Sequence, residues 1–171
     1  MGLLLLRPYV GSSGRSALVF PAATLLALGG LALTAPIPTG RIRLGTEPVA
    51  SPATVLAVGL AALAVARVAA GVPVPARVGV AGIALNTVAA VAEEAFFRRF
   101  LYSWLLRWGP ALAIAGSALA FASVHVPAYG VAAFWVDLGA GLLLSWQRWA
   151  SGGWAVPAGT HAAANLLAVL R

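Results

Sequence analysis

The sequence predicts an all-α protein, a polytopic transmembrane bundle of about six membrane helices. The first observation is composition: 61% of the 171 residues are hydrophobic and 9% are charged, whereas roughly 25% of residues are charged in ordinary soluble domains. The second is that apolar runs of about the ~20 residues needed to span a bilayer recur along the chain. The third is that these runs are apolar around their whole circumference and do not alternate, which favours lipid-embedded helices over barrel strands.

The expected helices are separated by segments rich in Pro, Gly and Arg, which end helices and mark membrane-interface loops. The sequence His125-Val126-Pro127 is expected to end the fourth helix. We expect residues 1–75 to form N-terminal transmembrane helices with connecting loops, and residues 76–171 to form a helical core, together one integral membrane domain. The expected helices cover residues 16–35, 52–70, 78–106, 109–125, 130–147 and 153–170.

Charge and cysteine content exclude several kinds of site. The absence of cysteine excludes disulfides, thiolate metal sites and cysteine nucleophiles. All of the basic residues are arginines, and no basic run carries interleaved aromatics, so we expect contact with the lipid bilayer and no nucleic-acid partner. Five helix-end arginines fall on one membrane face and four on the other. This small excess favours a multi-pass protein of the cell membrane with its site open to the cytoplasm.

Ionisable side chains inside the expected helices are few. One near the bilayer centre costs roughly 2.5–3.5 kcal/mol on insertion scales, so such a residue is expected to be paired or functional. Counting ~1.5 Å of rise per residue places five polar residues from four helices in one band, about 13–22 Å below a shared membrane face. The sequence therefore predicts a single buried site formed by Glu93, His125, Asp137, His161 and Asn165.

Helical spacing separates the roles of the two adjacent acids. Glu94 and Arg98 are four residues apart with the acid first, the favourable order for an ion pair on one helix face. We expect this pair to be structural and to fix the position of the helix. Glu93 is rotated away by about 100° and has no partner in its own helix. Glu93 is therefore the expected general base.

The last helix presents a second constellation. His161 and Asn165 are also four residues apart, so both side chains lie on one face and can donate hydrogen bonds to one oxygen, as in an oxyanion site. His125 adds a nitrogen ligand or proton carrier. Asp137 is expected either to support the site or to form a helix-packing bond, and Asn86 to hydrogen-bond a neighbouring helix.

Three further arginines are expected outside the site. Long basic side chains near helix ends can extend their charged groups to the lipid headgroups while their stems stay in apolar surroundings. This interfacial role is expected for Arg99, Arg107 and Arg148.

Three short motifs carry a resemblance to a known family. Residues 93–98 fit EExxxR, residues 121–125 fit FxxxH and residues 161–165 fit HxxxN. In this order and spacing the sequence resembles the CAAX protease and bacteriocin-processing family of intramembrane endopeptidases, relatives of the type II CAAX prenyl endopeptidase. The resemblance covers about residues 79–170.

The resemblance implies an intramembrane endopeptidase acting on a membrane-associated or lipidated peptide or protein. Glu93 and His125 would then activate water, while His161 and Asn165 would stabilise the tetrahedral oxyanion. In an alternative version Glu93, His125 and His161 bind a catalytic zinc ion, since His₂Glu is an accepted zinc ligand set. Asn165 is a poor zinc ligand and a good oxyanion donor, which favours the version without a cofactor.

Two other functions are compatible with a membrane bundle that contains buried polar residues. A noncatalytic scaffold or immunity-type protein could retain the fold, but the complete set of motifs argues against it. A proton-coupled transporter could use the carboxylates as a relay. The sequence contains no recognisable inverted repeat, which argues against the transporter.

Overall fold

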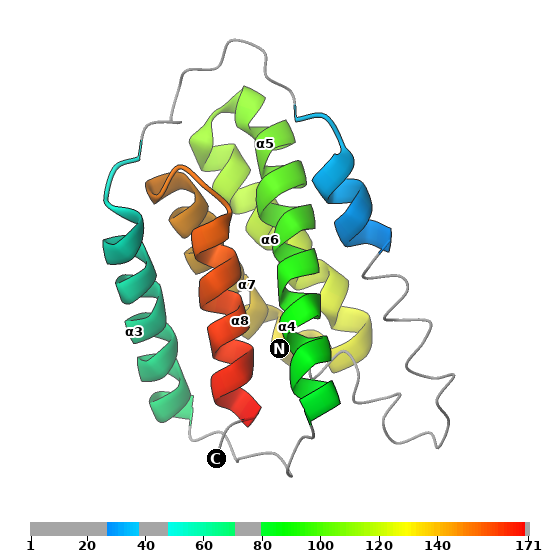
Figure 1. Ribbon diagram of the computed structural model, residues 1–171, viewed down its shortest axis with the longest axis vertical. Helices are drawn as coiled ribbons and strands as arrows, with labels where there is room; N and C mark the ends of the chain where they lie inside the picture. Colours follow the sequence, from blue (N-terminus) through cyan, green and yellow to red (C-terminus); the bar gives the residue numbers. More distant parts are fainter. Residues whose placement is uncertain (1–26, 38–47, 71–79, 170–171) are drawn as a thin grey trace.

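The computed structural model describes residues 27–37, 48–70 and 80–169, and every regular element in these ranges is helical (Figure 1). The predicted all-α class is confirmed. The expected helix at 16–35 is described only as a short helix at residues 27–34, and its earlier part lies outside the described residues. The other elements are α3 (Pro52–Ala70), α4 (Val80–Glu94), the π-helix η1 (Ala95–Leu101), α5 (Tyr102–Leu105), the 3-10 helix η2 (Leu106–Trp108), α6 (Pro110–Tyr129), α7 (Val131–Ala150) and α8 (Ala155–Val169).

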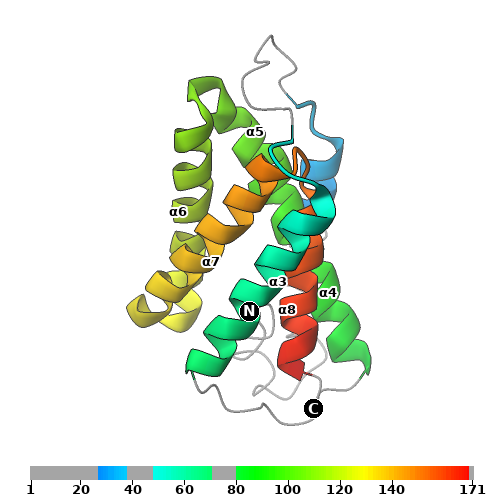
Figure 2. The same ribbon diagram turned by 90° about the vertical axis from the view of Figure 1, so that its left-hand side faces the viewer.

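The described helices form two layers. In one layer α8 packs between α3 and α4, and in the other α6 and α7 form an antiparallel pair (Figures 1 and 2). The layers meet where α7 contacts α3 and α8 and where α6 contacts η1 and α5. The interior between the layers therefore receives side chains from α4, α6, α7 and α8, the four helices that carry the predicted polar residues.

One continuous helix in the described part of the chain, Val80–Trp108, is long and apolar enough to cross a membrane. It consists of α4, η1, α5 and η2 in succession. Shorter apolar stretches occupy Pro52–Ala66 and Pro110–Val126. Large apolar side chains are also exposed on the outer surface of α7, among them Val131, Trp135 and Val136. Such an exposed apolar surface is expected where lipid covers a protein.

The predicted end of the fourth helix is wrong. α6 continues through Pro127 to Tyr129, although proline has no N–H to donate to the preceding turn. The helix ends at Gly130, whose φ of +77° is readily adopted by glycine and whose N–H donates to the carbonyl of Val126 at 2.8 Å.

A buried amide connects three helices. Gln147 in α7 is fully buried, and its Nε2 donates to the Val55 carbonyl in α3 and to Thr160 Oγ1 in α8, both at 2.9 Å. Gly59 allows this approach, since a Cβ at that position would lie 2.0 Å from the Gln147 Nε2. These bonds attach α3 to the helices that carry the site.

Candidate active site

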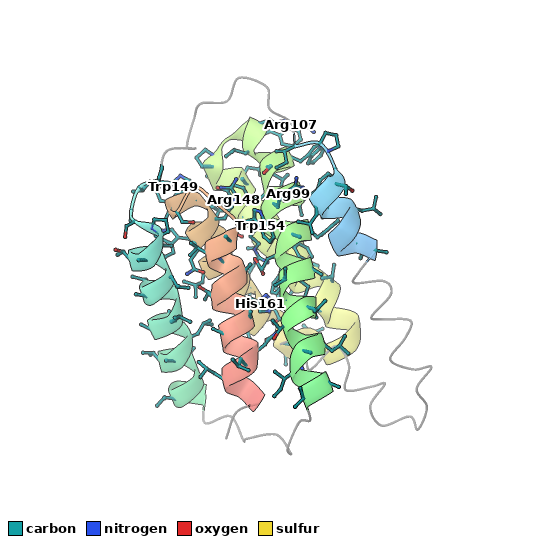
Figure 3. All side chains as sticks on the ribbon, in the orientation of Figure 1. Arg99, Arg107, Arg148, Trp149, Trp154 and His161 are labelled. Atoms are coloured by element: carbon teal, nitrogen blue, oxygen red, sulfur yellow. The ribbon has the colours of Figure 1, made fainter. Side chains whose placement is uncertain are left out.

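The predicted site residues lie in the interior, well below the end of the bundle where arginine and tryptophan gather. Figure 3 shows His161 about halfway along α8, with Arg107, Arg148 and Trp149 near one end of the bundle. The side chains of the five predicted residues are all buried, with relative exposures between 1% and 6%. The structure thus encloses the polar groups that the depth estimate put in one band.

Glu94 is fully buried and has two partners on one carboxylate oxygen. Its Oε1 accepts from Arg98 Nη1 at 2.9 Å, so the ion pair expected from helical spacing is present. The same oxygen lies 2.8 Å from Nδ1 of His161 in α8. The spacing argument could not reveal this second contact, because it joins residues 67 positions apart. Glu94 therefore orients the histidine as well as the arginine.

The contact with Glu94 determines which ring nitrogen of His161 faces Glu93. An ionised carboxylate only accepts hydrogen bonds, so the proton of that contact belongs to His161 Nδ1. The other nitrogen, Nε2, lies 3.8 Å from Glu93 Oε2. A neutral His161 ring would present a lone pair there, whereas a protonated ring would present an N–H. Neither oxygen of Glu93 has a hydrogen-bond partner among the described residues.

His125 is oriented by its own helix. Its Nδ1 lies 2.6 Å from the Phe121 carbonyl oxygen one turn earlier, and since a carbonyl only accepts, Nδ1 donates. In the neutral ring the lone pair is then on Nε2. This tautomer suits a group that accepts a proton or orients a water molecule.

Phe121 is a site residue for which the sequence analysis assigned no role. Its ring centroid lies 4.6 Å from that of His125 and 6.0 Å from that of His161. The guanidinium carbon of Arg98 lies 4.5 Å from the same centroid, a distance typical of a cation–π contact. The ring therefore brings two histidines from different helices against one surface. The sequence feature that could have indicated this role is the position of Phe121 at the start of the FxxxH motif.

The amides and Asp137 occupy the edges of this cluster. Asn165 Nδ2 donates to the backbone carbonyl of Asn86 at 3.4 Å, which joins α8 to α4. The side chain of Asn86 instead donates to Gly82 in its own helix at 2.7 Å, so the expected interhelical side-chain bond is wrong. Asp137 is buried on α7 within electrostatic range of His125 and His161.

Arg98 belongs to a π-helical turn that the sequence did not predict. η1 begins directly after Glu94, and the N–H of Tyr102 donates to the Phe97 carbonyl five residues earlier. Arg98 is fully buried, and its Nη2 also donates to the Gly141 carbonyl in α7 at 3.2 Å. This arginine therefore joins the carboxylate of Glu94 to the second helix layer.

Two of the three arginines for which an interfacial role is expected instead bond the backbone of other elements, and the role of Arg107 stays a prediction. Arg107 lies between the rings of Trp104 and Trp108, with its guanidinium carbon 3.9 and 3.8 Å from their centroids. Arg99 instead donates to the Ala32 carbonyl near the end of the short helix at 27–34. Basic side chains commonly bond the last carbonyls of a helix in this way.

Arg148 also differs from the expectation. Its Nε donates to the backbone carbonyl of Arg98 at 3.1 Å, and its guanidinium carbon lies 5.2 Å from the Tyr102 ring centroid. The side chain therefore turns inward toward η1, because a carbonyl of the π-helical turn is available to it there.

The described residues contain no group of three or more His, Cys, Asp or Glu side chains placed to hold a metal ion. His161 Nε2 lies 3.8 Å from Glu93 Oε2, and the Phe121 ring lies beside both His125 and His161, but these residues do not form such a group. Nδ1 of His125 is engaged by the Phe121 carbonyl and Nδ1 of His161 by Glu94, so a metal ion would have to bind these rings through Nε2.

Comparison with known proteins places the chain in a family. A family model described as "Type II CAAX prenyl endopeptidase Rce1-like" matches residues 75–167, just over half of the chain, and this range includes all three motifs. Searches of the curated proteins and of the solved structures found no match. The chain is therefore a member of the Rce1-like type II CAAX prenyl endopeptidase family, a family of membrane proteases.

Proposed function

We propose that this protein is an intramembrane endopeptidase that hydrolyses a peptide bond in a membrane-associated or lipidated substrate. The observation that carries the proposal is the arrangement around His161. Its Nδ1 is bonded to Glu94 at 2.8 Å, and its Nε2 lies 3.8 Å from the Glu93 carboxylate. A buried carboxylate that has no hydrogen-bond partner in the described part of the chain and lies next to an oriented imidazole is suited to general-base chemistry.

The proposed reaction begins with a water molecule between Glu93 and His125. Glu93 takes a proton from the water, and the hydroxide attacks the carbonyl carbon of the scissile peptide bond. The carbonyl oxygen becomes an oxyanion that accepts hydrogen bonds from Asn165 Nδ2 and from protonated His161 Nε2. When the C–N bond breaks, the leaving amine takes the proton that Glu93 had accepted, which regenerates the carboxylate.

Charge balance supports a protonated His161 during the reaction. Glu93 and Glu94 contribute two negative charges in an interior where isolated charges are strongly disfavoured. Arg98, fully buried beside Glu94, contributes one positive charge. A protonated His161, in contact with Glu94 and close to Glu93, supplies the second. The four side chains then carry no net charge.

We further propose that the reaction needs no zinc ion, because Asn165 is a poor zinc ligand and a good oxyanion donor. The six-helix bundle would be a multi-pass protein of the cell membrane, with the lipid bilayer and a membrane-bound peptide as its partners. Its active site would open to the cytoplasm. We propose no nucleic-acid partner.

The test is hydrolysis of an internally quenched, farnesylated peptide ending in a CAAX sequence. The purified full chain is compared with Glu93→Gln, each with and without a chelator. We expect Glu93→Gln to lose activity by at least about 100-fold, the lower end of the contribution of a general base. Its thermal unfolding should match the wild type, which shows that the loss is chemical. The chelator should have no effect.

Two outcomes would contradict the proposal in different ways. Activity retained by Glu93→Gln would refute the assignment of the base. Loss on chelation that added zinc reverses would replace the metal-free mechanism with the zinc version. A folded wild-type chain that cleaves neither farnesylated nor unmodified membrane-bound peptides would instead favour a noncatalytic scaffold.

A further inference from the structure

The π-helical turn η1 connects the proposed active site to two side chains outside it. In a π-helix the hydrogen bonds run between residues five apart, so the turn is wider than in an α-helix. Successive side chains then point in directions that an α-helical turn would not give them. Because η1 starts immediately after Glu94 and contains Arg98, the direction in which Arg98 leaves the backbone depends on this turn.

Two consecutive carbonyls of the turn accept hydrogen bonds from other helices. Ser117 Oγ in α6 donates to the Phe97 carbonyl at 2.8 Å, and Ser117 is fully buried. Arg148 Nε in α7 donates to the Arg98 carbonyl at 3.1 Å. In a regular α-helix these carbonyls would be directed at the N–H groups four residues later. Donors placed to the side of the helix therefore favour the wider turn.

The contacts continue from the turn to the proposed oxyanion donor. Arg98 Nη1 lies 2.9 Å from Glu94 Oε1, and Arg98 Nη2 lies 3.2 Å from the Gly141 carbonyl oxygen. The same Glu94 oxygen lies 2.8 Å from His161 Nδ1. A change in the direction of Arg98 would therefore alter the electrostatic environment of the Glu94–His161 bond.

We infer that Ser117 and Arg148 are positioning residues of the proposed active site. They bond the π-helical turn, the turn directs Arg98 at Glu94, and Glu94 orients His161. Neither residue contacts the reacting atoms. The inference rests on the proposed function for its catalytic consequence, but the effect on the Glu94–His161 bond is independent of whether the protein cleaves peptides.

The test uses the imidazole nitrogens as reporters. The sequence contains two histidines, so full-length protein labelled with ¹⁵N-histidine in detergent micelles gives only four ring-nitrogen signals, which a His125→Gln variant assigns. We expect Ser117→Ala and Arg148→Met to shift the His161 Nδ1 signal. Ser117→Thr and Arg148→Lys, which keep a donor, should restore it toward the wild-type position.

Two matched controls distinguish positioning from general loss of packing. Ser145 is also fully buried, and its hydroxyl has no hydrogen-bond partner within the described ranges, so Ser145→Ala should leave the signal in place. Arg107→Met removes an arginine whose described contacts are with tryptophan rings alone. This variant should also leave the His161 Nδ1 signal in place.

Activity gives a second readout. A positioning residue affects the transition state and not the binding of the substrate, so kcat for the farnesylated peptide should fall about fivefold in Ser117→Ala with KM unchanged. The controls should stay within about twofold of wild type.

The outcomes separate the two proposals. A His161 Nδ1 signal that stays in place in both Ser117→Ala and Arg148→Met would overturn the positioning inference, even if Glu93→Gln is inactive. A shifted signal in a protein without any peptidase activity would support the positioning inference and refute the proposed function. If Ser117→Ala fails to fold, the comparison of Arg148→Met with Arg148→Lys tests the positioning inference alone. It does so through the Arg98 carbonyl, which accepts from Arg148.

Discussion

His161 Nδ1 lies 2.8 Å from Glu94 Oε1, and this buried contact joins α8 to α4. The oxygen is the one that also accepts from Arg98, so a single atom of Glu94 accepts hydrogen bonds from both side chains. The second acid of the motif is thus more than a structural partner of the arginine. It determines which nitrogen of His161 faces Glu93, and through that nitrogen it determines what His161 can donate.

The two adjacent glutamates should respond differently to the same substitution. Glu94→Gln leaves Arg98 buried without its carboxylate, and breaking a buried pair in this way costs about 3–5 kcal/mol of unfolding free energy. Glu93 has no hydrogen-bond partner in the described structure, so Glu93→Gln should leave stability near wild type. Unfolding of both variants in detergent micelles measures the difference.

A double variant controls this comparison. Glu94→Gln combined with Arg98→Met removes both charges and should recover much of the stability lost in Glu94→Gln, since a buried pair can be replaced by apolar groups with little loss. Activity should not recover, because His161 still lacks its anionic partner. Equal destabilisation by Glu93→Gln and Glu94→Gln would contradict this division of roles.

Asn165 should affect the rate constant and leave binding almost unchanged. Asn165→Ala removes a proposed oxyanion donor, and loss of one such donor lowers kcat by about 10²–10³-fold. KM for the farnesylated peptide should change little, since the oxyanion exists only in the transition state. Steady-state kinetics measure both constants.

Asn86 provides a matched control for Asn165. It is equally buried, but its side chain bonds Gly82 in its own helix, and its contact with Asn165 is through the backbone. Asn86→Ala should therefore keep kcat within about threefold of wild type, the range expected for loss of one weak hydrogen bond. Similar losses of kcat in both variants would exclude a specific role for Asn165.

Phe121 should influence catalysis through the groups packed on its ring. Phe121→Leu keeps an apolar side chain but removes the flat surface against which His125, His161 and Arg98 lie. We expect kcat to fall about tenfold, equivalent to about 1.4 kcal/mol, which is within the range of a lost cation–π or aromatic contact. Kinetics and ¹⁵N-histidine spectra are the measurements.

The control for Phe121 is Phe100→Leu. Phe100 lies in η1, half-buried, with its ring 6.0 Å from that of Phe96 and with no described ring contact to a site residue. Its replacement should leave both histidine spectra unchanged. If Phe100→Leu moved those spectra as much as Phe121→Leu did, the effect would come from general loosening of the bundle.

The fold could be predicted where one physical signal dominates. Apolar runs and Pro- or Gly-rich breaks predicted the described helices well, including the one at 52–70, because the apolar residues of each helix and the residues that separate helices are both visible in the sequence. Pro127 was misread as the end of its helix, which continues to Tyr129 and is capped by Gly130 with its positive φ. The π-helical turn was missed because its bonds depend on Ser117 and Arg148, which belong to other helices.

The sequence proposed members of the candidate site, which the structure buries, but it did not predict their contacts. Depth and motif spacing identified Glu93, His125, His161 and Asn165, since polar residues are rare in apolar helices. The bond between Glu94 and His161 and the central place of Phe121 depend on how α4, α6 and α8 pack. Periodicity within one helix contains no information on that packing.

The last prediction concerns α3, which lies outside the residues matched by the family model. A Cβ at Gly59 would lie 2.0 Å from Gln147 Nε2 and 3.1 Å from Thr160 Cγ2. Gly59→Ala therefore requires Gln147 to leave its bonds to Val55 and Thr160. Each buried polar group left without a partner costs about 1–3 kcal/mol, so unfolding should occur at clearly lower temperature.

Gly139→Ala is the matched control, because nothing lies within 4 Å of a Cβ at that position in α7. Alanine is preferred to glycine inside a helix by roughly 0.5–1 kcal/mol, so this variant should be as stable as wild type or slightly more stable. Adding Gln147→Ala to Gly59→Ala should be less destabilising than the sum of the two single changes, since the shorter side chain removes the clash. Strict additivity would show that α3 does not depend on the Gln147 contact. Non-additivity would mean that the buried Gln147 amide helps to hold α3 against α7 and α8.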